Sequence, residues 1–455
     1  MSDLPATEIR TTAPEIGTTE WVMDRCDDLT RHSSRPDALE RVYLSPEHSA
    51  GNTAVQAWMR DAGLDTETDA AGNIWGRRAA DGTPQRPATR GEPALVLGSH
   101  LDTVPDAGRY DGMLGVVLAI AVAHRLRDTP LPFALEVVGF SAEEGTRFGK
   151  ALLGSCATSG QWDPAWWETA DADGVTLREA FVRFGLVPER VGDAARDPAD
   201  LVGYLEAHIE QGPVLEARDL PLGYVTTIAG ARRFVLTVTG EARHAGGTPF
   251  SRRKDALVAA AHLVTRIEEL AKATDSLATV GDIRVQPGAV NVIPGRAELT
   301  LDLRGRTDAG RDELWEQIAA AGRDIAQERG VTFEFAETHR APSTACADRM
   351  KAAVATGVAE ATGTSPDDVL GLWSPAGHDG MAMDAVTDVG MLFLRCRDGI
   401  SHHPDEHVEP EDVGAALDAY TAAVLELARV HVPAPLVALR QAQDPPVETP
   451  GEKAR

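Results

Sequence analysis

The sequence predicts an α/β fold with two domains, a mixed-sheet α/β domain and an inserted ferredoxin-like α+β domain. Short apolar runs that end in polar turns alternate with helical patterns in the first and last parts of the chain. From about residue 225 the order becomes strand-helix-strand-strand-helix-strand, which is typical of a ferredoxin-like module. The 455 residues also exceed what one ordinary core holds. We therefore expect a small domain inserted into a larger one.

These patterns set the expected boundaries. The larger domain would comprise residues 18–224 and 341–432, and the inserted domain residues 225–340. Residues 433–455, rich in Pro, Gln and charge, would form a disordered tail. The outer strands of the inserted domain can pair across a two-fold axis with those of a second copy. We therefore expect a homodimer through this domain, which would also serve as a lid.

Individual elements follow in order along the larger domain. Residues 94–97 (ALVL) are short and apolar enough for a buried strand, and the small apolar residues 115–123 predict a helix packed on the sheet. Further strands are expected at 133–140 and 389–395, a strand-to-turn segment at 203–213, and helices at 350–362 and 412–430. The inserted domain would contain strands at 234–240, 279–285, 297–304 and 331–337, and helices at 255–272 and 311–329.

Composition excludes several classes of partner. The formal charge of −26 argues against nucleic acid or an anionic membrane, because binding to either needs a basic surface. The sequence contains no apolar run of membrane-spanning length, and its first residues lack the basic start and apolar core of a signal peptide. Four scattered cysteines suggest free thiols in a reducing compartment. We therefore expect a cytoplasmic protein with a small-molecule substrate.

Polar side chains follow the ends of the predicted strands. They are His100, Asp102, Asp111, Glu143, Glu144, His208, His378, Asp379, His402 and His403. The carboxyl ends of parallel strands share one edge of a sheet, so these groups can meet there. Imidazoles and carboxylates without cysteine suit Zn²⁺ or Mn²⁺. Their number fits two ions bridged by a carboxylate, and of two adjacent glutamates one can bind metal while the other moves protons.

Seven segments occur in one order over residues 20–430. They are GSHLDTVPDAGRYDG, FSAEEGTRFG, HIEQGPVLE, GEARHAGGTPFSRRKDA, PGAVNVIPGRAELTLDLR, SPAGHDGMAM and GISHHPDE. In these segments the chain resembles the hydantoinase/carbamoylase group of two-metal amidohydrolases, relatives of aminoacylases and metal-dependent exopeptidases. The resemblance implies hydrolysis of the carbamoyl (ureido) C–N bond of a small carboxylate, with release of ammonia and CO₂. Allantoate is the first expected substrate, and the alternatives are an N-carbamoyl-L-amino acid or the substrate of a β-ureidopropionase.

The resemblance also implies a role for each matching residue. The ligands of two divalent ions, Zn²⁺ or Mn²⁺ with Co²⁺ or Ni²⁺ also possible, would be His100, Asp111, Glu144, His208 and His402, with Asp111 as the bridge. Asp102 would orient His100, and Glu143 would act as general base and then as acid. His403 is the alternative to His402, which is favoured because the family motif is Ser-His followed by a variable residue and Pro.

Substrate contacts would come mainly from the inserted domain. Arg304 ends a predicted strand, where its guanidinium suits a carboxylate, although a surface ion pair is the alternative. By resemblance, Asn291 would add a hydrogen bond and Gln211 would face the ureido group. His244 would stabilise the oxyanion in the site of the other protomer, although it could also be an ordinary loop residue.

The loop after His244 departs from the family pattern. Gly247 and Phe250 stand where the family usually has Thr and Met. Gly247 should loosen this loop and thereby affect its closure and the substrate preference.

Two other function classes stay open. A peptidase or aminoacylase is disfavoured because the peptidase relatives usually have a carboxylate at the position of His208. A non-catalytic, metal-stabilised binding protein would have no need of Glu143.

Overall fold

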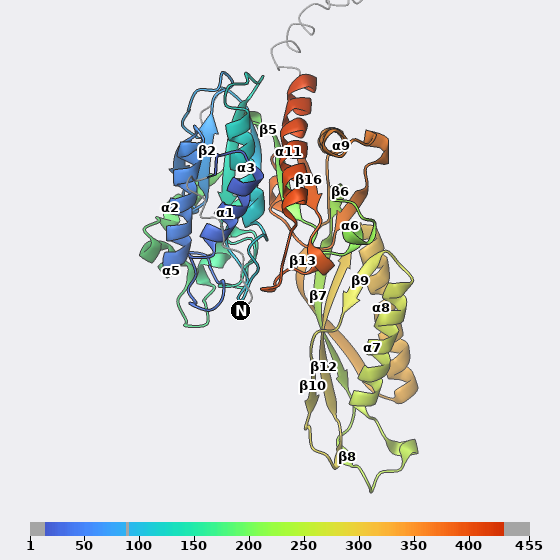
Figure 1. Ribbon diagram of the computed structural model, residues 1–455. Helices are drawn as coiled ribbons and strands as arrows, with labels where there is room; N and C mark the ends of the chain where they lie inside the picture. The colour runs from blue at the N-terminus through green and yellow to red at the C-terminus, as the bar shows by residue number, and fades with distance from the viewer. Residues whose placement is uncertain (1–13, 88–90, 432–455) are drawn as a thin grey trace, which may run out of the picture.

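The structure, a computed structural model, describes residues 14–87 and 91–431. The predicted tail at 433–455 lies outside these residues. A nine-stranded mixed sheet with its helices forms the larger part, and a five-stranded antiparallel sheet with two long helices extends from it (Figure 1). The predicted mixed-sheet α/β fold is therefore confirmed.

The larger sheet has the order β1-β2-β4-β3-β5-β16-β6-β14, with β15 beside β6. Its strands are β1 (Asp65–Thr68), β2 (Ile74–Arg78), β3 (Ala94–His100), β4 (Ala134–Phe140), β5 (Leu201–Ile209), β6 (Leu222–Ile228), β14 (Thr344–Ala345), β15 (Gly371–Ser374) and β16 (Val389–Leu394). The central strands β4, β3, β5 and β16 are parallel and buried along their whole length, as expected of strands covered on both faces. Their carboxyl ends therefore share one edge.

Five longer helices pack on this sheet. They are α1 (Thr19–Leu29), α2 (Pro46–Asp61), α3 (Met113–Arg125), α9 (Asp348–Thr362) and α11 (Pro410–Val430), and their apolar side chains join one core cluster. The short helices are α4 (Leu153–Thr158), α5 (Leu177–Phe184), α6 (Val214–Ala217) and α10 (Gly380–Met383). Every residue of α3 from Met113 to Ala123 is buried, because the helix is enclosed on all sides. This enclosure fixes the loop that enters α3 from β3.

The smaller sheet has the order β10-β12-β7-β13, with β9 also paired to β12. Its elements are β7 (Gly230–Thr239), β9 (Ser276–Thr279), β10 (Ile283–Gln286), β12 (Arg296–Gly305), β13 (Thr332–Ala341), α7 (Ala256–Lys272) and α8 (Asp308–Arg329). The two helices and the sheet share a separate core, in which Phe234 stacks on Trp315 at 3.6 Å between ring centroids. The boundary expected at residue 225 falls within β6, which pairs with β16 of the larger sheet, so the chain crosses between the sheets at Ala229.

A two-stranded ribbon lies at the far end of the smaller part. β8 (Arg243–His244) pairs with β11 (Val292–Ile293), beyond the ends of β7 and β12 at Thr239 and Arg296. Figure 1 shows β8 at the opposite end of the smaller sheet from the larger part of the molecule. Across the described residues, no helix is both long and apolar enough to cross a membrane.

Candidate metal centre

The five predicted metal ligands meet at the carboxyl edge of the larger sheet. His100 ends β3, His208 lies near the end of β5, and Asp111 directly precedes Gly112 at the start of α3. Glu144 follows β4, and His402 follows β16. Their ligand atoms form two close groups, one of His100, Asp111 and His208 and one of Asp111, Glu144 and His402. The residues come from the carboxyl ends of four strands, which the sheet brings together.

Asp111 stands between the two groups. Its Oδ1 lies 3.0 Å from His208 Nε2 and 3.6 Å from His100 Nε2. Its Oδ2 lies 3.0 Å from His402 Nε2, which is 3.4 Å from Glu144 Oε1. Each carboxylate oxygen of Asp111 thus faces a different group. This is the arrangement required of a carboxylate that bridges two ions.

The hydrogen bonds of the buried histidines leave the correct nitrogen for a metal. His100 Nδ1 lies 3.0 Å from the carbonyl oxygen of Asp102, and His208 Nδ1 lies 2.9 Å from that of Ile209. Because a carbonyl only accepts, each Nδ1 carries the proton and each Nε2 offers its lone pair to the centre. His208 Nε2 is buried without a hydrogen bond of good geometry among the described residues. The donor set fits Zn²⁺ or Mn²⁺.

The electrostatics also favour a cation. Burial raises the pKa of Glu143 well above its ordinary value; His100 opposes this shift and the Glu144 carboxylate adds to it. Burial and the charge of Asp111 raise the pKa of Glu144 to about 7. Burial also opposes ionisation of Asp111, but the three histidines around its carboxylate hold its pKa well below the usual range. Several carboxylates thus lie close together in a buried space, where their negative charges repel one another. Bound divalent cations would reduce this repulsion.

The carboxylate of Asp102 contacts the glutamate loop more closely than it contacts His100. Its two oxygens accept the backbone N–H groups of Glu143 and Glu144 at 3.0 and 3.1 Å, while Oδ1 is 3.6 Å from His100 Nδ1. Ala142, just before this pair, has a φ of 59°, which is strained for a residue other than glycine. Asp102 therefore holds the ring of His100 with its carbonyl and the strained glutamate loop with its carboxylate.

The two adjacent histidines of the loop after β16 point in different directions. The Nε2 atom of His402 turns toward Asp111 and Glu144. His403 is exposed, and its Nδ1 lies 3.6 Å from the exposed carboxylate of Asp405. The geometry therefore favours His402 as the ligand.

The predicted substrate residues fall into two separate groups. Gln211 Nε2 donates to Asp111 Oδ2 at 3.1 Å, at the centre itself. Arg304 donates to the carbonyl of Pro375 at 2.8 Å and also pairs with Asp302 at 2.8 Å. Pro375 begins the turn that leads to His378, whose ring packs on that of His208 at 4.5 Å between centroids. Gln211 and Arg304 thus both lie near the metal centre.

His244 and Asn291 lie at the opposite end of the smaller sheet. They are neighbours, because the N–H of Ala245 donates to the carbonyl of Asn291 at 2.9 Å. The strand β12 separates them from Arg304, and its span from Arg296 to Arg304 is about 26 Å at ~3.3 Å per residue. Within one chain, His244 therefore does not reach the metal centre.

The loop after His244 contains hydrogen bonds between its own residues. The N–H of Gly247 donates to His244 Nδ1 at 3.0 Å, and Arg253 donates to the carbonyl of Ala245 at 2.7 Å. Phe250 is 86% exposed, under the guanidinium of Arg253 at 4.3 Å from the ring centroid. The Gly247 contact leaves the proton of a neutral His244 ring on Nε2.

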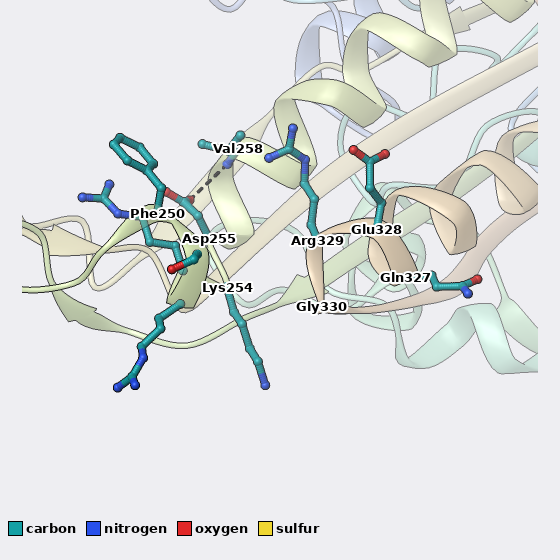
Figure 2. A pocket seen from close by; sticks show the side chains of 11 residues that line it. Phe250, Lys254, Asp255, Val258, Gln327, Glu328, Arg329 and Gly330 are labelled. Carbon is teal, nitrogen blue, oxygen red and sulfur yellow. Dashed lines mark hydrogen bonds between the residues drawn. The ribbon is translucent and has the colours of Figure 1, made fainter.

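A pocket of about 680 Å³ lies behind this loop, between the start of α7 and the end of α8 (Figure 2). Asp255 lines this pocket, and it caps α7 by accepting the backbone N–H groups of Leu257 and Val258 at 3.1 Å. None of the predicted metal ligands lines this pocket. It is therefore a feature of the smaller part of the molecule and separate from the metal centre.

Two residues of the centre were missed from the sequence. Glu406 accepts the backbone N–H of Asp111, and Ser401 lies within hydrogen-bond distance of both Glu406 and Asp111. Both stand in the GISHHPDE segment, which was the available signal, but Glu406 is 295 positions from Asp111 along the chain. The histidines of this segment lie nearer the end of the predicted strand at 389–395 than its last carboxylate, Glu406.

A cluster of histidines and carboxylates at the carboxyl edge of a mixed α/β sheet is typical of a metal-dependent enzyme. The model of the peptidase family M20/M25/M40 matches residues 96–426, and the chain belongs to this family. The prediction of a hydrolase of the hydantoinase/carbamoylase group is confirmed by the similar proteins.

Three similar proteins illustrate this relationship. The chain is 38% identical over 424 residues to an allantoate deiminase of Arabidopsis thaliana, covering 86% of this chain and 79% of that protein. It is also 38% identical over 417 residues to an N-carbamoyl-L-amino acid amidohydrolase of Geobacillus stearothermophilus, covering 90% and 98%. The crystal structure of a hydantoinase/carbamoylase family amidase from Burkholderia multivorans superposes with a TM-score of 0.81 at 30% identity, covering 92% of this chain and 100% of that one.

Proposed function

We propose that the protein is a two-ion amidohydrolase that cleaves the carbamoyl (ureido) C–N bond of a small carboxylate, with allantoate as the first substrate. The observation that carries this proposal is the position of Asp111, whose two oxygens face separate groups of ligands beside the buried carboxylate of Glu143. The names of the two relatives, an allantoate deiminase and an N-carbamoyl-L-amino acid amidohydrolase, support the substrate class. N-carbamoyl-L-amino acids and N-carbamoyl-β-alanine are the alternative substrates.

Each residue has a defined task in this reaction. His100 and His208 would hold one ion, Glu144 and His402 the other, and Asp111 both. Two divalent ions bound there would polarise the scissile carbonyl and lower the pKa of water.

Glu143 performs the proton transfers. It takes a proton from the attacking water and later delivers it to the leaving nitrogen. Its buried position keeps bulk water from competing for that proton. The products are an amine and a carbamate, and the carbamate decomposes to ammonia and CO₂.

Substrate choice is tested by ammonia release. Protein loaded with Mn²⁺ is incubated with allantoate, N-carbamoyl-L-amino acids and N-carbamoyl-β-alanine in parallel. Preference for allantoate is the expected result. Preference for a carbamoyl amino acid would keep the mechanism and change the substrate. No release from any of the three, with metal bound, would overturn the proposal.

Arg304 is the residue that would bind the substrate carboxylate. Arg304→Gln should raise KM by about 10- to 100-fold and change kcat much less, because a charge-assisted contact to a non-reacting part of the substrate is lost. The control is Arg306→Gln, which changes an exposed arginine just beyond the same strand. Steady-state kinetics measure both constants. An unchanged KM in Arg304→Gln would assign Arg304 to its ion pair with Asp302 alone.

We infer that the smaller sheet and its helices form a ferredoxin-like lid and dimerisation domain. The strand order β13-β7-β12, continued by β9 and β10 on β12, supports a ferredoxin-like module. The outer strand β13 is mostly exposed along its ten residues, which suits pairing with a second copy. His244 is far from the metal centre of its own chain, with a proton available on Nε2 for an oxyanion. It would therefore serve the site of a second copy.

This arrangement predicts complementation between two inactive variants. His244→Ala and Glu143→Gln should each be nearly inactive alone. A dimer of one chain of each variant contains one intact site, so random mixing should restore about a quarter of the wild-type sites. Ammonia release after subunit exchange measures the recovery, and two differently tagged Glu143→Gln preparations serve as the control. No recovery in verified mixed dimers would contradict a shared site.

A cytoplasmic location completes the proposal. All four cysteines are free, as expected of thiols in a reducing compartment.

A further inference from the structure

Glu406 joins two distant loops beneath the metal centre. It lies between β16 and α11, and only 3% of its surface is exposed. Its Oε1 accepts the backbone N–H groups of Tyr110 at 2.7 Å and of Asp111 at 3.1 Å. Its Oε2 accepts the hydroxyl of Ser401 at 2.9 Å. The side chain thus fixes the loop that carries Asp111 against the loop that carries His402.

The direction of the hydrogen bonds around Ser401 follows from its single proton. Gln211 Nε2 donates to Ser401 Oγ and to Asp111 Oδ2, both at 3.1 Å. Ser401 Oγ is 2.9 Å from Glu406 but 3.3 Å from Asp111, so the closer Glu406 oxygen receives the proton. Gln211 thus donates a hydrogen bond to the carboxylate of Asp111, while Glu406 accepts the backbone N–H of the same residue.

The side chain of Glu406 is packed tightly against the loop that carries Asp111. A Cβ atom at Gly108 would lie 2.3 Å from Glu406 Cβ and 2.4 Å from Glu406 Oε1, so the loop backbone rests directly on this side chain. Among the described residues, no Lys or Arg forms a salt bridge with Glu406. Two backbone N–H groups and one hydroxyl therefore stabilise this buried carboxylate.

We propose that Glu406 is a positioning residue of the metal centre. It sets the Asp111 carboxylate between the two ion positions and holds the His402 loop at the distance that completes the second position. It touches neither the reacting atoms nor the ions, and it acts through Asp111 and Ser401. The inference rests on the two-ion centre proposed above, but it is independent of the substrate.

The test measures metal binding directly. Metal-free wild-type, Glu406→Ala and Glu406→Gln proteins are titrated with Mn²⁺ by calorimetry, and their ion content is counted after dialysis. The control is Asp405→Asn, which removes the neighbouring exposed carboxylate. Glu406→Ala should bind the second ion about 10- to 100-fold more weakly, the usual effect of losing a residue that supports a ligand. Binding of the first ion, which retains His100 and His208, should weaken less.

Kinetics separate positioning from a general loss of structure. At limiting Mn²⁺, Glu406→Ala should lose kcat with little change in KM, and excess Mn²⁺ should restore part of the loss. Glu406→Gln retains the acceptor for Tyr110 and Asp111, so its affinity for the second ion should fall between those of the wild type and Glu406→Ala. If Glu406→Ala fails to fold, Glu406→Gln tests the inference in its place. Wild-type affinity for both ions in a folded Glu406→Ala or, in its place, in Glu406→Gln would overturn the inference. A wild type that binds fewer than two ions would instead overturn the proposed centre and, with it, this role.

Discussion

Glu143→Gln should lower kcat by about 10²- to 10⁴-fold and leave the binding of both ions nearly unchanged. Glutamine has almost the same shape as glutamate, but its amide cannot take a proton from water or return it to the leaving nitrogen. Glu143 is buried beside His100 and Glu144, and its carboxylate is not needed to complete either ligand group around Asp111. The backbone N–H of residue 143 would still bind Asp102, so the loop should keep its form.

The measurement combines kinetics with ion counting on the same preparation. The control variant is Glu168→Gln, which changes an exposed glutamate outside the centre. Wild-type turnover by Glu143→Gln would show that another group moves the proton, and the general-base role would be wrong. Loss of an ion together with activity would make Glu143 a ligand in addition to or instead of a base.

Asp111→Asn should abolish the two-ion centre. One oxygen of Asp111 faces His208 and the other faces His402, so a single substitution removes charge from both ion positions. The amide nitrogen of asparagine carries hydrogens and cannot bind a cation. We expect the protein to retain at most one ion at micromolar Mn²⁺ and to lose activity by at least about 10³-fold.

The same loop offers a matched control for this prediction. Asp106 is exposed and has a φ of 58°, a conformation that asparagine tolerates well. Asp106→Asn should therefore keep both ions and full activity. Ion content by atomic emission and turnover by ammonia release compare the two variants. Two tightly bound ions in Asp111→Asn would be incompatible with the bridging role.

The sequence by itself determined the order of the main elements and indicated which residues meet in the candidate metal centre. The apolar run at 94–97 and the small residues at 115–123 became β3 and α3, because burial on all sides leaves a local apolar signal. His100 and His208 were identified because they end such strands, and parallel strands bring their carboxyl ends together. Periodicity and strand-end position are local properties, so they can be read without the tertiary structure.

The tertiary structure alone decided the contacts between distant loops. It placed Glu406 beneath Asp111, directed the carboxylate of Asp102 to the glutamate loop, and separated His244 from Arg304 by the length of β12. It also showed that the chain passes from one sheet to the other at Ala229, since β6 pairs with β16. Such contacts depend on how separate loops pack at one sheet edge, and no sequence period encodes the distance between residues that lie hundreds of positions apart.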